Sequence, residues 1–285
     1  MCGRYAASRD PDDLVEEIEG AGLPLSPLAE VDRETLHASY NVAPTQPVAT
    51  VLAPRPAADD AGTDGADGSD GSVRAVGPAP ARLRAMRWGL VPSWAKDPKV
   101  GNRMINARVE TVAEKPAYRS LVASRRCVLP ADGWFEWQTV PAERSPTGKA
   151  RKQPFFMAPV DGGLVGLAGL YSWWRDRDVA DDEDPAAWLG TVTVLTTDAE
   201  PALQAVHDRM PVVLPPEHWQ EWVSRDVPGD EALALLRSLP EGRFAAVPVQ
   251  AAVGNVRNDS PALLQRPDDA ELAGVVDPTT GQLFG

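Results

Sequence analysis

The chain has 285 residues, enough for one large domain or two small ones, and its 43% hydrophobic and 24% charged residues are typical of soluble globular proteins. No apolar run approaches the roughly 18 residues that a membrane-spanning helix needs, and the N-terminus has no signal-peptide pattern, so we expect a cytoplasmic protein that binds no membrane. The formal net charge of −13 argues, as a sum, against a nucleic-acid partner. With two cysteines and three histidines at separate places, neither a disulfide framework nor a metal site is expected.

The first feature along the chain is the sequence Met1-Cys2-Gly3-Arg4. Cys is small enough for an initiator Met in front of it to be removed, which leaves a thiol and a free α-amine on one residue. The ordinary pKa of the amine is about 8 and that of the thiol about 8.5, so both are partly deprotonated near neutral pH. Such an aminothiol condenses with an aldehyde and closes a thiazolidine ring, or it acts as an N-terminal nucleophile with its amine as the base. Cys127, in an apolar run, is interpreted as a buried structural thiol.

Apolar periodicity and turn residues predict the regular elements. Helices are expected at 11–20, with Asp10 or Asp12 as the cap, and at 113–122, 215–223 and 230–238. Strands are expected at 48–52, 82–88, 134–139, 155–159, 164–170, 191–197 and 244–249. Short strands interleaved irregularly with short helices favour an α+β domain over a regular βαβ alternation. Residues 54–80, rich in Ala, Asp, Gly, Ser and Pro, are interpreted as a disordered insertion in a hairpin loop.

A basic segment follows this insertion. From Arg82 to Arg126 the sequence has eleven Lys and Arg against three acidic residues, a local balance of +8 in an acidic chain. A groove for a polyanion and a solvated face are both consistent with this balance. The segment holds Trp88 and Trp94 in the sequence W-G-L-V-P-S-W. Exposed Trp beside basic residues stacks on nucleobases, whereas packing in the core is the default for each ring.

Polar residues within apolar, strand-like segments are the candidates for chemistry. Asn106, Arg108 and Glu110 share one face of a strand because their spacing is two residues. Glu136 in the sequence G-W-F-E-W is expected to be desolvated, which raises the pKa of a carboxylate and suits acid/base work. A salt bridge from Glu136 to Arg108 is the structural alternative. His207 in the sequence H-D-R-M-P is the third candidate.

Seven segments occur in an order that resembles one known family. They are M-C-G-R-Y at 1–5, Y-N-V-A-P-T-Q at 40–46, R-W-G-L-V-P-S-W at 87–94, I-N-A-R-V-E-T at 105–111, A-D-G-W-F-E-W at 131–137, H-D-R-M-P at 207–211 and G-N-V-R-N at 254–258. Together they resemble the SRAP family, the SOS-response-associated or abasic-site-processing proteins. Two departures are Ala95 after Trp94, where the family often has a second aromatic residue, and a short insertion around 99–103.

The resemblance implies a single α+β domain with a β-rich, barrel-like core of mostly antiparallel strands flanked by short helices, over residues 1–265, and a C-terminal tail at 266–285. It implies a monomer, without cofactor or metal, that has a basic channel for single-stranded DNA containing abasic sites. Family members form a covalent thiazolidine between the N-terminal Cys and the ring-opened aldehyde of the abasic site, which shields the lesion in the DNA-damage or SOS response. Association with the nucleoid after DNA damage, lyase activity and autoproteolytic peptidase activity are further expectations from the family.

By the motifs, four residues take catalytic roles. Cys2 is the nucleophile, Asn106 positions its amine and the sugar, and Glu136 moves protons during Schiff-base and ring formation. His207 acts as general acid and base at the sugar oxygen and in reversal. The residues that the resemblance assigns to DNA binding are Arg4, Pro44, Trp88, Trp94, Arg108, Thr196 and Arg209.

Two alternative hypotheses remain. Class II glutamine amidotransferases also begin Met-Cys-Gly and attack an amide with the Cys, but we find no Arg-Gly-Pro-type glutamine-binding segment and no Asn-Gly oxyanion region at suitable spacing. A non-catalytic single-strand binder would use the basic segment and the Trp residues and leave Cys2 inert. Replacing Cys2 separates the hypotheses, because only the binder keeps all its activity.

Overall fold

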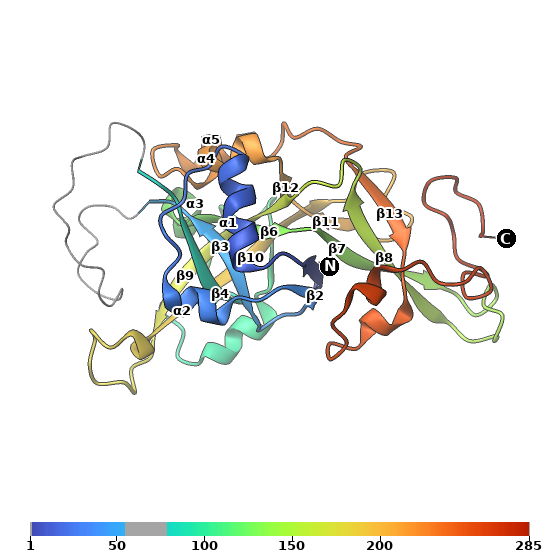
Figure 1. Ribbon diagram of the computed structural model, residues 1–285, viewed down its shortest axis with the longest axis horizontal. Coiled ribbons are helices and arrows are strands. Elements are labelled where there is room, and N and C mark those ends of the chain that lie inside the picture. The colour runs from blue at the N-terminus through green and yellow to red at the C-terminus, as the bar shows by residue number, and fades with distance from the viewer. Residues whose placement is uncertain (1, 55–78, 285) are drawn as a thin grey trace.

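The computed structural model describes residues 2–54 and 79–284. The predicted insertion at 54–80 falls almost entirely outside these ranges, so it stays a prediction. Within them the chain forms two β-sheets with short helices around them (Figure 1).

Five strands of the larger sheet close into a barrel. Their order is β10-β4-β3-β6-β9, and β9 pairs again with β10. The five are β3 (Pro47–Leu52), β4 (Arg82–Trp88), β6 (Arg126–Ala131), β9 (Val165–Arg175) and β10 (Trp188–Asp198). Every neighbouring pair in the ring is antiparallel except β4 with β10. The predicted α+β fold with a barrel-like, mostly antiparallel core is therefore confirmed.

Three short strands extend the sheet of this barrel beside β9 and β10. They are β5 (Asn106–Arg108), β11 (Arg209–Pro211) and β12 (Val213–Leu214). Strand β5 runs parallel to β10, whereas β11 is antiparallel to β10 and β12 is antiparallel to β9. Strand β10 consequently carries β5 and β11 as direct neighbours.

The second sheet has the order β13-β8-β7-β1-β2 and is antiparallel throughout. Its strands are β1 (Tyr5–Ala7), β2 (Ser39–Val42), β7 (Gly133–Val140), β8 (Arg151–Pro159) and β13 (Phe244–Pro248). The hairpin of β7 and β8 projects away from the barrel toward the C-terminal segment (Figure 1). The first strand of the chain is thus held between two later strands.

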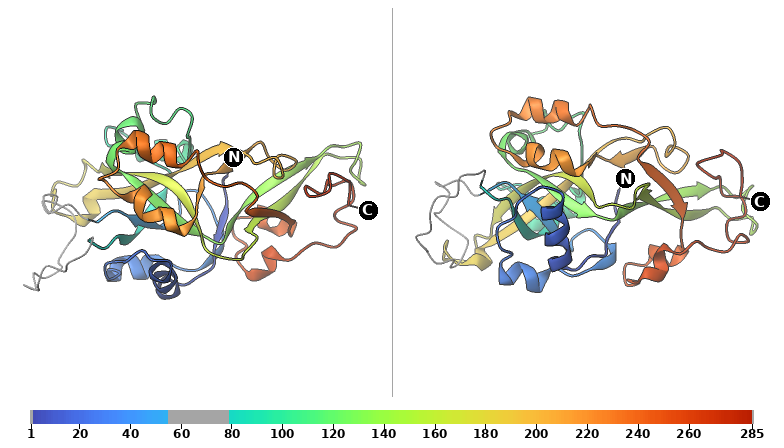
Figure 2. Two further views of the ribbon diagram at one scale, coloured as in Figure 1. Left: turned by 90° about the horizontal axis from the view of Figure 1, so that it is seen from above. Right: turned by 45° about the horizontal axis from the view of Figure 1, so that its top comes forward.

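The helices lie on two sides of the barrel, with α1 and α2 opposite α4 and α5 (Figure 2). The α-helices are α1 (Pro11–Gly20), α2 (Glu30–Thr35), α3 (Arg119–Ser124), α4 (Trp219–Val223) and α5 (Gly229–Leu235). The 3-10 helices are η1 (Pro98–Arg103), η2 (Pro185–Ala187), η3 (Pro216–His218), η4 (Ala251–Gly254) and η5 (Pro261–Leu264). Among the described residues no helix is both long enough and apolar enough to span a bilayer.

Local chemistry explains where the helices begin. The Asp10 side chain accepts the backbone N–H groups of Asp12 and Asp13 and so caps α1 as predicted, while Leu14 and Ile18, four residues apart, bury one face. The helix predicted at 113–122 is wrong in its extent, because α3 begins only at Arg119 and turns precede it. Pro116 disfavours the helical conformation of the residue before it, which accounts for the late start.

The segment 266–284, which the sequence analysis sets apart as a tail, packs on the rest of the fold. Leu272 and Val275 are fully buried in the hydrophobic cluster that also contains Cys2. The Arg151 guanidinium on β8 donates to the carbonyls of Glu271 at 2.6 Å and Ala273 at 2.9 Å. This part of the chain therefore belongs to the structure around the N-terminus.

Candidate active site

Cys2 lies where the two sheets meet. It precedes β1, which pairs with β2 on one side and β7 on the other, and it is fully buried. The ring of Tyr5 packs against Trp88 with 5.3 Å between centroids, which ties the start of β1 to the barrel strand β4. Burial raises the pKa of the Cys2 thiol well above its ordinary value, and the nearby Glu136 carboxylate raises it further.

Asn106 reaches Cys2 from strand β5. The pairing of Asn106 with Val194 of β10 places its side chain so that Nδ2 donates to the carbonyl oxygen of Cys2 at 2.7 Å. The amide oxygen Oδ1 is buried and has no hydrogen-bond partner among the described residues. A buried acceptor without a partner is costly, so this oxygen is available for a donor such as an amine at Cys2.

Glu136 stands on β7, and only 2% of it is exposed. Burial raises the pKa of its carboxyl to about 7. The desolvation that the sequence predicts for this residue is therefore present in the structure. Near neutral pH the group exists in both forms, so it can accept a proton in one step and donate one in another.

His207 faces Glu136 from a different part of the chain. The His207 loop, residues 199–208, joins β10 to β11, and Nε2 of His207 lies 4.0 Å from Oε2 of Glu136. Nδ1 accepts the backbone N–H of Arg209 at 2.9 Å, which assigns the proton of the neutral ring to Nε2, the atom nearer Glu136. Burial lowers the pKa of His207, so the ring is neutral at neutral pH. Asp208 Oδ1 is 3.0 Å from Nδ1 and can support the ring when it becomes protonated.

The four residues predicted to be catalytic thus come together from four elements. Asn106 is hydrogen-bonded to the Cys2 backbone, the Glu136 carboxylate raises the pKa of the Cys2 thiol, and His207 faces Glu136. A nucleophile, an amide acceptor and two groups that exchange protons near neutral pH are the parts that imine chemistry requires. In the described part of the chain, no group of three or more His, Cys, Asp and Glu side chains could hold a metal ion.

Two of the arginines predicted to contact DNA are bonded to the protein itself. Arg4 donates to Asn41 Oδ1 at 2.6 Å and to the carbonyls of Val253 at 2.8 Å and Gly254 at 3.2 Å. Arg209 holds the carboxylate of Glu110 with both terminal nitrogens at 2.8 and 2.9 Å. It also contacts Asp198 at 2.5 Å and the Thr196 carbonyl at 2.8 Å. In this conformation both guanidinium groups therefore hold parts of the protein together around the site.

The other predicted DNA contacts divide by exposure. Trp88 is fully buried and donates from Nε1 to the carbonyl of Ile105 at 2.9 Å, so the prediction that it contacts DNA is corrected: it is a core residue. The Thr196 side chain is likewise buried in β10, 4% exposed, so its contact with DNA stays a prediction. Trp94 is 65% exposed, and Arg108 is also exposed. These two remain candidates for binding DNA.

Pro44 is half-buried and stands beside a strained turn. The next residue, Thr45, has φ of 74°, a left-handed conformation that is unfavourable for a β-branched side chain. Its N–H donates to the carbonyl of Trp88 at 2.8 Å, which fixes the turn on the barrel. The short insertion around 99–103 lies in η1. Gly101 of η1 packs closely against Gly89, because a Cβ added at Gly89 would lie only 2.6 Å from the Gly101 carbonyl oxygen.

Comparison with known proteins identifies the family. A family model described as SOS response associated peptidase (SRAP) matches residues 1–256. The chain belongs to the SRAP family. It is 33% identical over 267 residues to the abasic site processing protein YoqW of Bacillus subtilis, covering 93% of this chain and 99% of that protein. The abasic site processing protein YedK of Escherichia coli is 32% identical with the same coverages, and HMCES of Xenopus tropicalis is 31% identical, covering 92% of this chain and 77% of that protein.

A solved structure supports the SRAP fold independently of close sequence similarity. The X-ray structure of a protein from Bacteroides thetaiotaomicron is similar with a TM-score of 0.66 at 21% identity, covering 93% of this chain and 100% of that one. At this level of identity the likeness concerns the fold.

Two buried polar residues of this SRAP chain were not predicted as part of the site. Asn41 donates to the carbonyls of Val253, Asn255 and Asn258 and accepts from Arg4, so it joins three motifs of the family. Its place within Y-N-V-A-P-T-Q was the available signal. The second residue is Gln138, two positions after Glu136 on β7; it was visible as a polar residue in an apolar strand.

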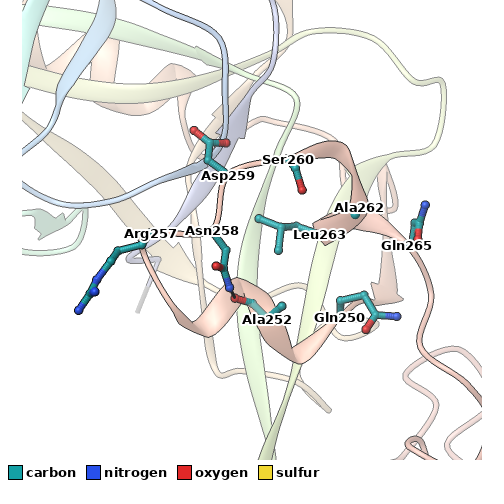
Figure 3. A pocket seen from close by; sticks show the side chains of 9 residues that line it. All are labelled: Gln250, Ala252, Arg257, Asn258, Asp259, Ser260, Ala262, Leu263 and Gln265. Carbon is teal, nitrogen blue, oxygen red and sulfur yellow. Dashed lines mark hydrogen bonds between the residues drawn. The ribbon is translucent and has the colours of Figure 1, made fainter.

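The loop that receives Arg4 also frames a cavity of about 740 Å³, seen in Figure 3 between η4 and η5. Leu263 points into it, whereas Arg257 is directed away from the other lining side chains (Figure 3). None of the four candidate catalytic residues lines this cavity. It is therefore a neighbour of the site and separate from it.

Proposed function

We propose that this protein captures abasic sites in single-stranded DNA as a covalent thiazolidine on Cys2, after Met1 has been removed. The observation that carries the proposal is the grouping of three side chains near Cys2: Asn106 donates to its carbonyl, Glu136 is close enough to raise the pKa of its thiol, and His207 lies 4.0 Å from Glu136. The printed names of the relatives, abasic site processing proteins, support the same substrate.

The chemistry follows from the groups present. The Cys2 amine attacks the aldehyde carbon of the ring-opened sugar and gives a carbinolamine. Loss of one water, helped by a proton from Glu136 in its acid form, gives the imine. The Cys2 thiol then adds to the imine carbon while its proton passes, through Glu136 in its basic form, to the nitrogen. One water leaves in the whole sequence, and no oxidant or reductant is needed.

Glu136 and His207 divide the proton transfers between two oxygens of the substrate. The carboxyl with its pKa raised to about 7 serves the carbinolamine hydroxyl. As the sugar ring opens, the neutral imidazole donates from Nε2 to the ring oxygen, and the proton that leaves the C1 hydroxyl passes through Glu136 in its basic form to restore Nε2. The 4.0 Å between Oε2 and Nε2 is longer than a hydrogen bond, so the two groups can each reach a different substrate oxygen. The same transfers run backwards when the adduct reverses.

DNA binding is proposed to rest on backbone contacts and stacking. The exposed Arg108 provides a charge for phosphate next to Asn106, and the exposed Trp94 provides a surface for a base. Phosphate contacts carry no sequence information, so selectivity would come from the aldehyde. We propose that the protein acts as a monomer on the nucleoid after DNA damage, with lyase activity and peptidase activity on the residue before Cys2 as secondary functions.

The test is a denaturing gel of the purified protein with single-stranded DNA that contains one abasic site. Wild type is expected to give an adduct resistant to heat and SDS, with a mass equal to the two components less one water. Cys2→Ala should give none, while Cys127→Ala, which removes the other fully buried thiol, should still give it.

Two results would contradict the proposal. One is the absence of an adduct from wild-type protein whose Met1 is shown by mass spectrometry to be removed, after which glutaminase activity would be assayed. The other is an adduct that persists in Cys2→Ala. Full single-strand binding together with no adduct in any variant would favour the non-catalytic binder.

A further inference from the structure

Gln138 connects the strand of Glu136 to the loop of His207. It lies two residues after Glu136 on β7, so both side chains are on the same face of the strand, and it is 4% exposed. Its Nε2 donates to the carbonyl of Ala205 at 3.0 Å. Ala205 belongs to the His207 loop, two residues before the imidazole. The contact therefore spans the two elements that carry the proton-transfer pair.

A second set of contacts holds the Gln138 amide in one orientation. Nε2 also donates to the carbonyl of Val276 at 3.0 Å, and Oε1 accepts the N–H of Val276 at 2.8 Å. Because Val276 presents both a donor and an acceptor, only one of the two amide flips satisfies it. The N–H that remains is then directed at Ala205.

The segment that presents Val276 is itself fixed. Leu272 and Val275 are fully buried in the hydrophobic cluster that also contains Cys2 and, from the His207 loop, Leu203 and Val206. The Phe284 N–H donates to the Val275 carbonyl at 2.9 Å, and Val276 bridges to Leu283. We call residues 271–276 the C-terminal strap. It lies beyond residue 256, where the match to the SRAP family model ends.

We propose that Gln138, held by the C-terminal strap, is a positioning residue that fixes the His207 loop relative to Glu136. The proposal rests on the proposed function for its catalytic readout. His207 and Glu136 are 4.0 Å apart and come from elements that no strand pairing joins directly, so their separation depends on side-chain contacts such as this one. Misplacing a proton-transfer group by about 1 Å can reduce a rate by about a hundredfold.

The chain offers a matched control in Gln153. Gln153 on β8 is paired directly with Gln138 across the β7–β8 ladder and is 3% exposed. Its Nε2 also donates to two carbonyls, those of Pro154 and Val249, and neither belongs to the His207 loop. Its Oε1 accepts from Arg151 at 3.3 Å, and this indirect contact through the Arg151 side chain is its one link to the C-terminal strap among the contacts described. Gln138→Met and Gln153→Met therefore remove an amide from similar depth, and they differ in the direct bond to the His207 loop.

The experiment measures the rate of adduct formation at saturating abasic DNA for both variants in the full chain. Gln138→Met is expected to be at least about tenfold slower than wild type, with Gln153→Met within about twofold. Binding of intact single-stranded DNA should be unchanged in both. In a His207→Ala background, Gln138→Met should cause no further loss, because it acts through His207. Gln138→Asn keeps an uncharged amide but is one methylene shorter, so it cannot span Val276 and Ala205 as Gln does; with Gln153→Asn as its control, it replaces Gln138→Met if that variant does not fold.

Three results would overturn the proposal: equal losses in the two Gln variants, no loss in Gln138→Met, or a full additional loss in the His207→Ala background. A readout that needs no DNA separates this proposal from the proposed function. The imidazole resonances of His207 in the free protein should move in Gln138→Met and stay in place in Gln153→Met. If wild type forms no adduct, the proposed function fails, and these resonances alone support or overturn the positioning role.

Discussion

Arg126 at the start of β6 and Glu136 within β7 are both nearly inaccessible to solvent, 1% and 2% exposed, and both belong to largely apolar strands. Arg126 is satisfied by five backbone carbonyls, those of Val122, Ala123, Trp222, Ser224 and Val227. Several of these are at the C-terminal ends of α3 and α4, where the helix dipole is negative. The charge therefore holds two helices on the barrel.

Glu136 has different surroundings. It faces His207 at 4.0 Å, and burial brings the pKa of its carboxyl to about 7. Depth of burial therefore does not separate structure from chemistry in this molecule. Arg126 keeps its charge among five carbonyls, whereas the Glu136 carboxyl can exchange a proton near neutral pH because burial raises its pKa to about 7.

Removing the Arg126 charge tests its structural role and should change stability more than any other substitution considered. Arg126→Met leaves five carbonyls without their common donor, so we expect a loss of about 4 kcal/mol in the free energy of unfolding. Urea denaturation measures it. The rate of adduct formation per folded molecule should stay near that of wild type, and a specific loss of rate would show that Arg126 also serves the site.

Glu136→Gln tests the proton-transfer role of Glu136. It should raise the stability of the protein near pH 8 and lower the rate of adduct formation. The pKa of this carboxyl is raised from 4.5 to about 7 in the folded protein, so its stabilising proton is fully bound below about pH 4.5 and is lost as pH rises through about 7. Gln cannot ionise, so it avoids the cost of burying a charge above pH 7. The free energy of unfolding of the variant should therefore be about 2 kcal/mol larger than that of wild type near pH 8, and close to that of wild type near pH 4.

In the same variant the rate of adduct formation should fall at least about a hundredfold. In wild type the rate should pass through a maximum near pH 7, since the acid form of Glu136 serves the loss of water and its basic form accepts the thiol proton. The part of this pH dependence that is due to Glu136 should disappear in Glu136→Gln. Denaturation at the two pH values and a pH–rate profile decide both points, and a variant that is less stable near pH 8 would contradict the assignment.

Trp94→Ala separates binding from the chemistry at Glu136. With 65% of it exposed, Trp94 can stack on a base, and its loss should weaken binding of single-stranded DNA by about tenfold. Fluorescence anisotropy measures the affinity, and the rate at saturating DNA should not change. Val31→Ala on α2, where 62% of the residue is exposed, is the control for removing exposed apolar surface. Equal effects in the two variants would remove Trp94 from the binding surface.

The smallest effect is expected for Asp208→Asn. The Asp208 carboxylate lies 3.0 Å from Nδ1 of His207 and raises the pKa of the ring against the lowering by burial. Its removal should lower the midpoint of the His207 titration measured by NMR and change the rate by less than about threefold, because the Asp208 side chain is 88% exposed and screened. The difference from wild type should shrink further at high salt. A midpoint that rises would contradict the geometry.

Local sequence patterns predicted the parts of this fold that depend on neighbours in the chain. The helix capped by Asp10 and the strand at 82–88 match the structure. Closure of the barrel could not be predicted in this way, because it depends on β10 pairing in parallel with β4, which lies far earlier in the chain. The family resemblance provided that information.

In the candidate site, too, local motifs could be recognised in the sequence, whereas contacts between distant residues could not. Cys2, Asn106, Glu136 and His207 could be named because each has a distinctive chemistry within its motif. The burial of Trp88 and the internal bonds of Arg4 could not be read from the motifs, since an alternating pattern does not tell which face of a strand meets a second sheet. Gln138 was visible as a polar residue in β7, but its partners Ala205 and Val276 are distant in the chain.

The place of β1 between β2 and β7 has a consequence for how the protein matures. Tyr5 pairs with Trp134, so the N-terminal strand cannot dock between both neighbours until about half of the chain has been synthesised and β7 is available. An aminopeptidase needs an unpaired N-terminus, which the growing chain offers before β1 is held between β2 and β7. The order of two events, processing and folding, therefore decides whether Cys2 of the mature protein presents the free amine that the proposed function requires.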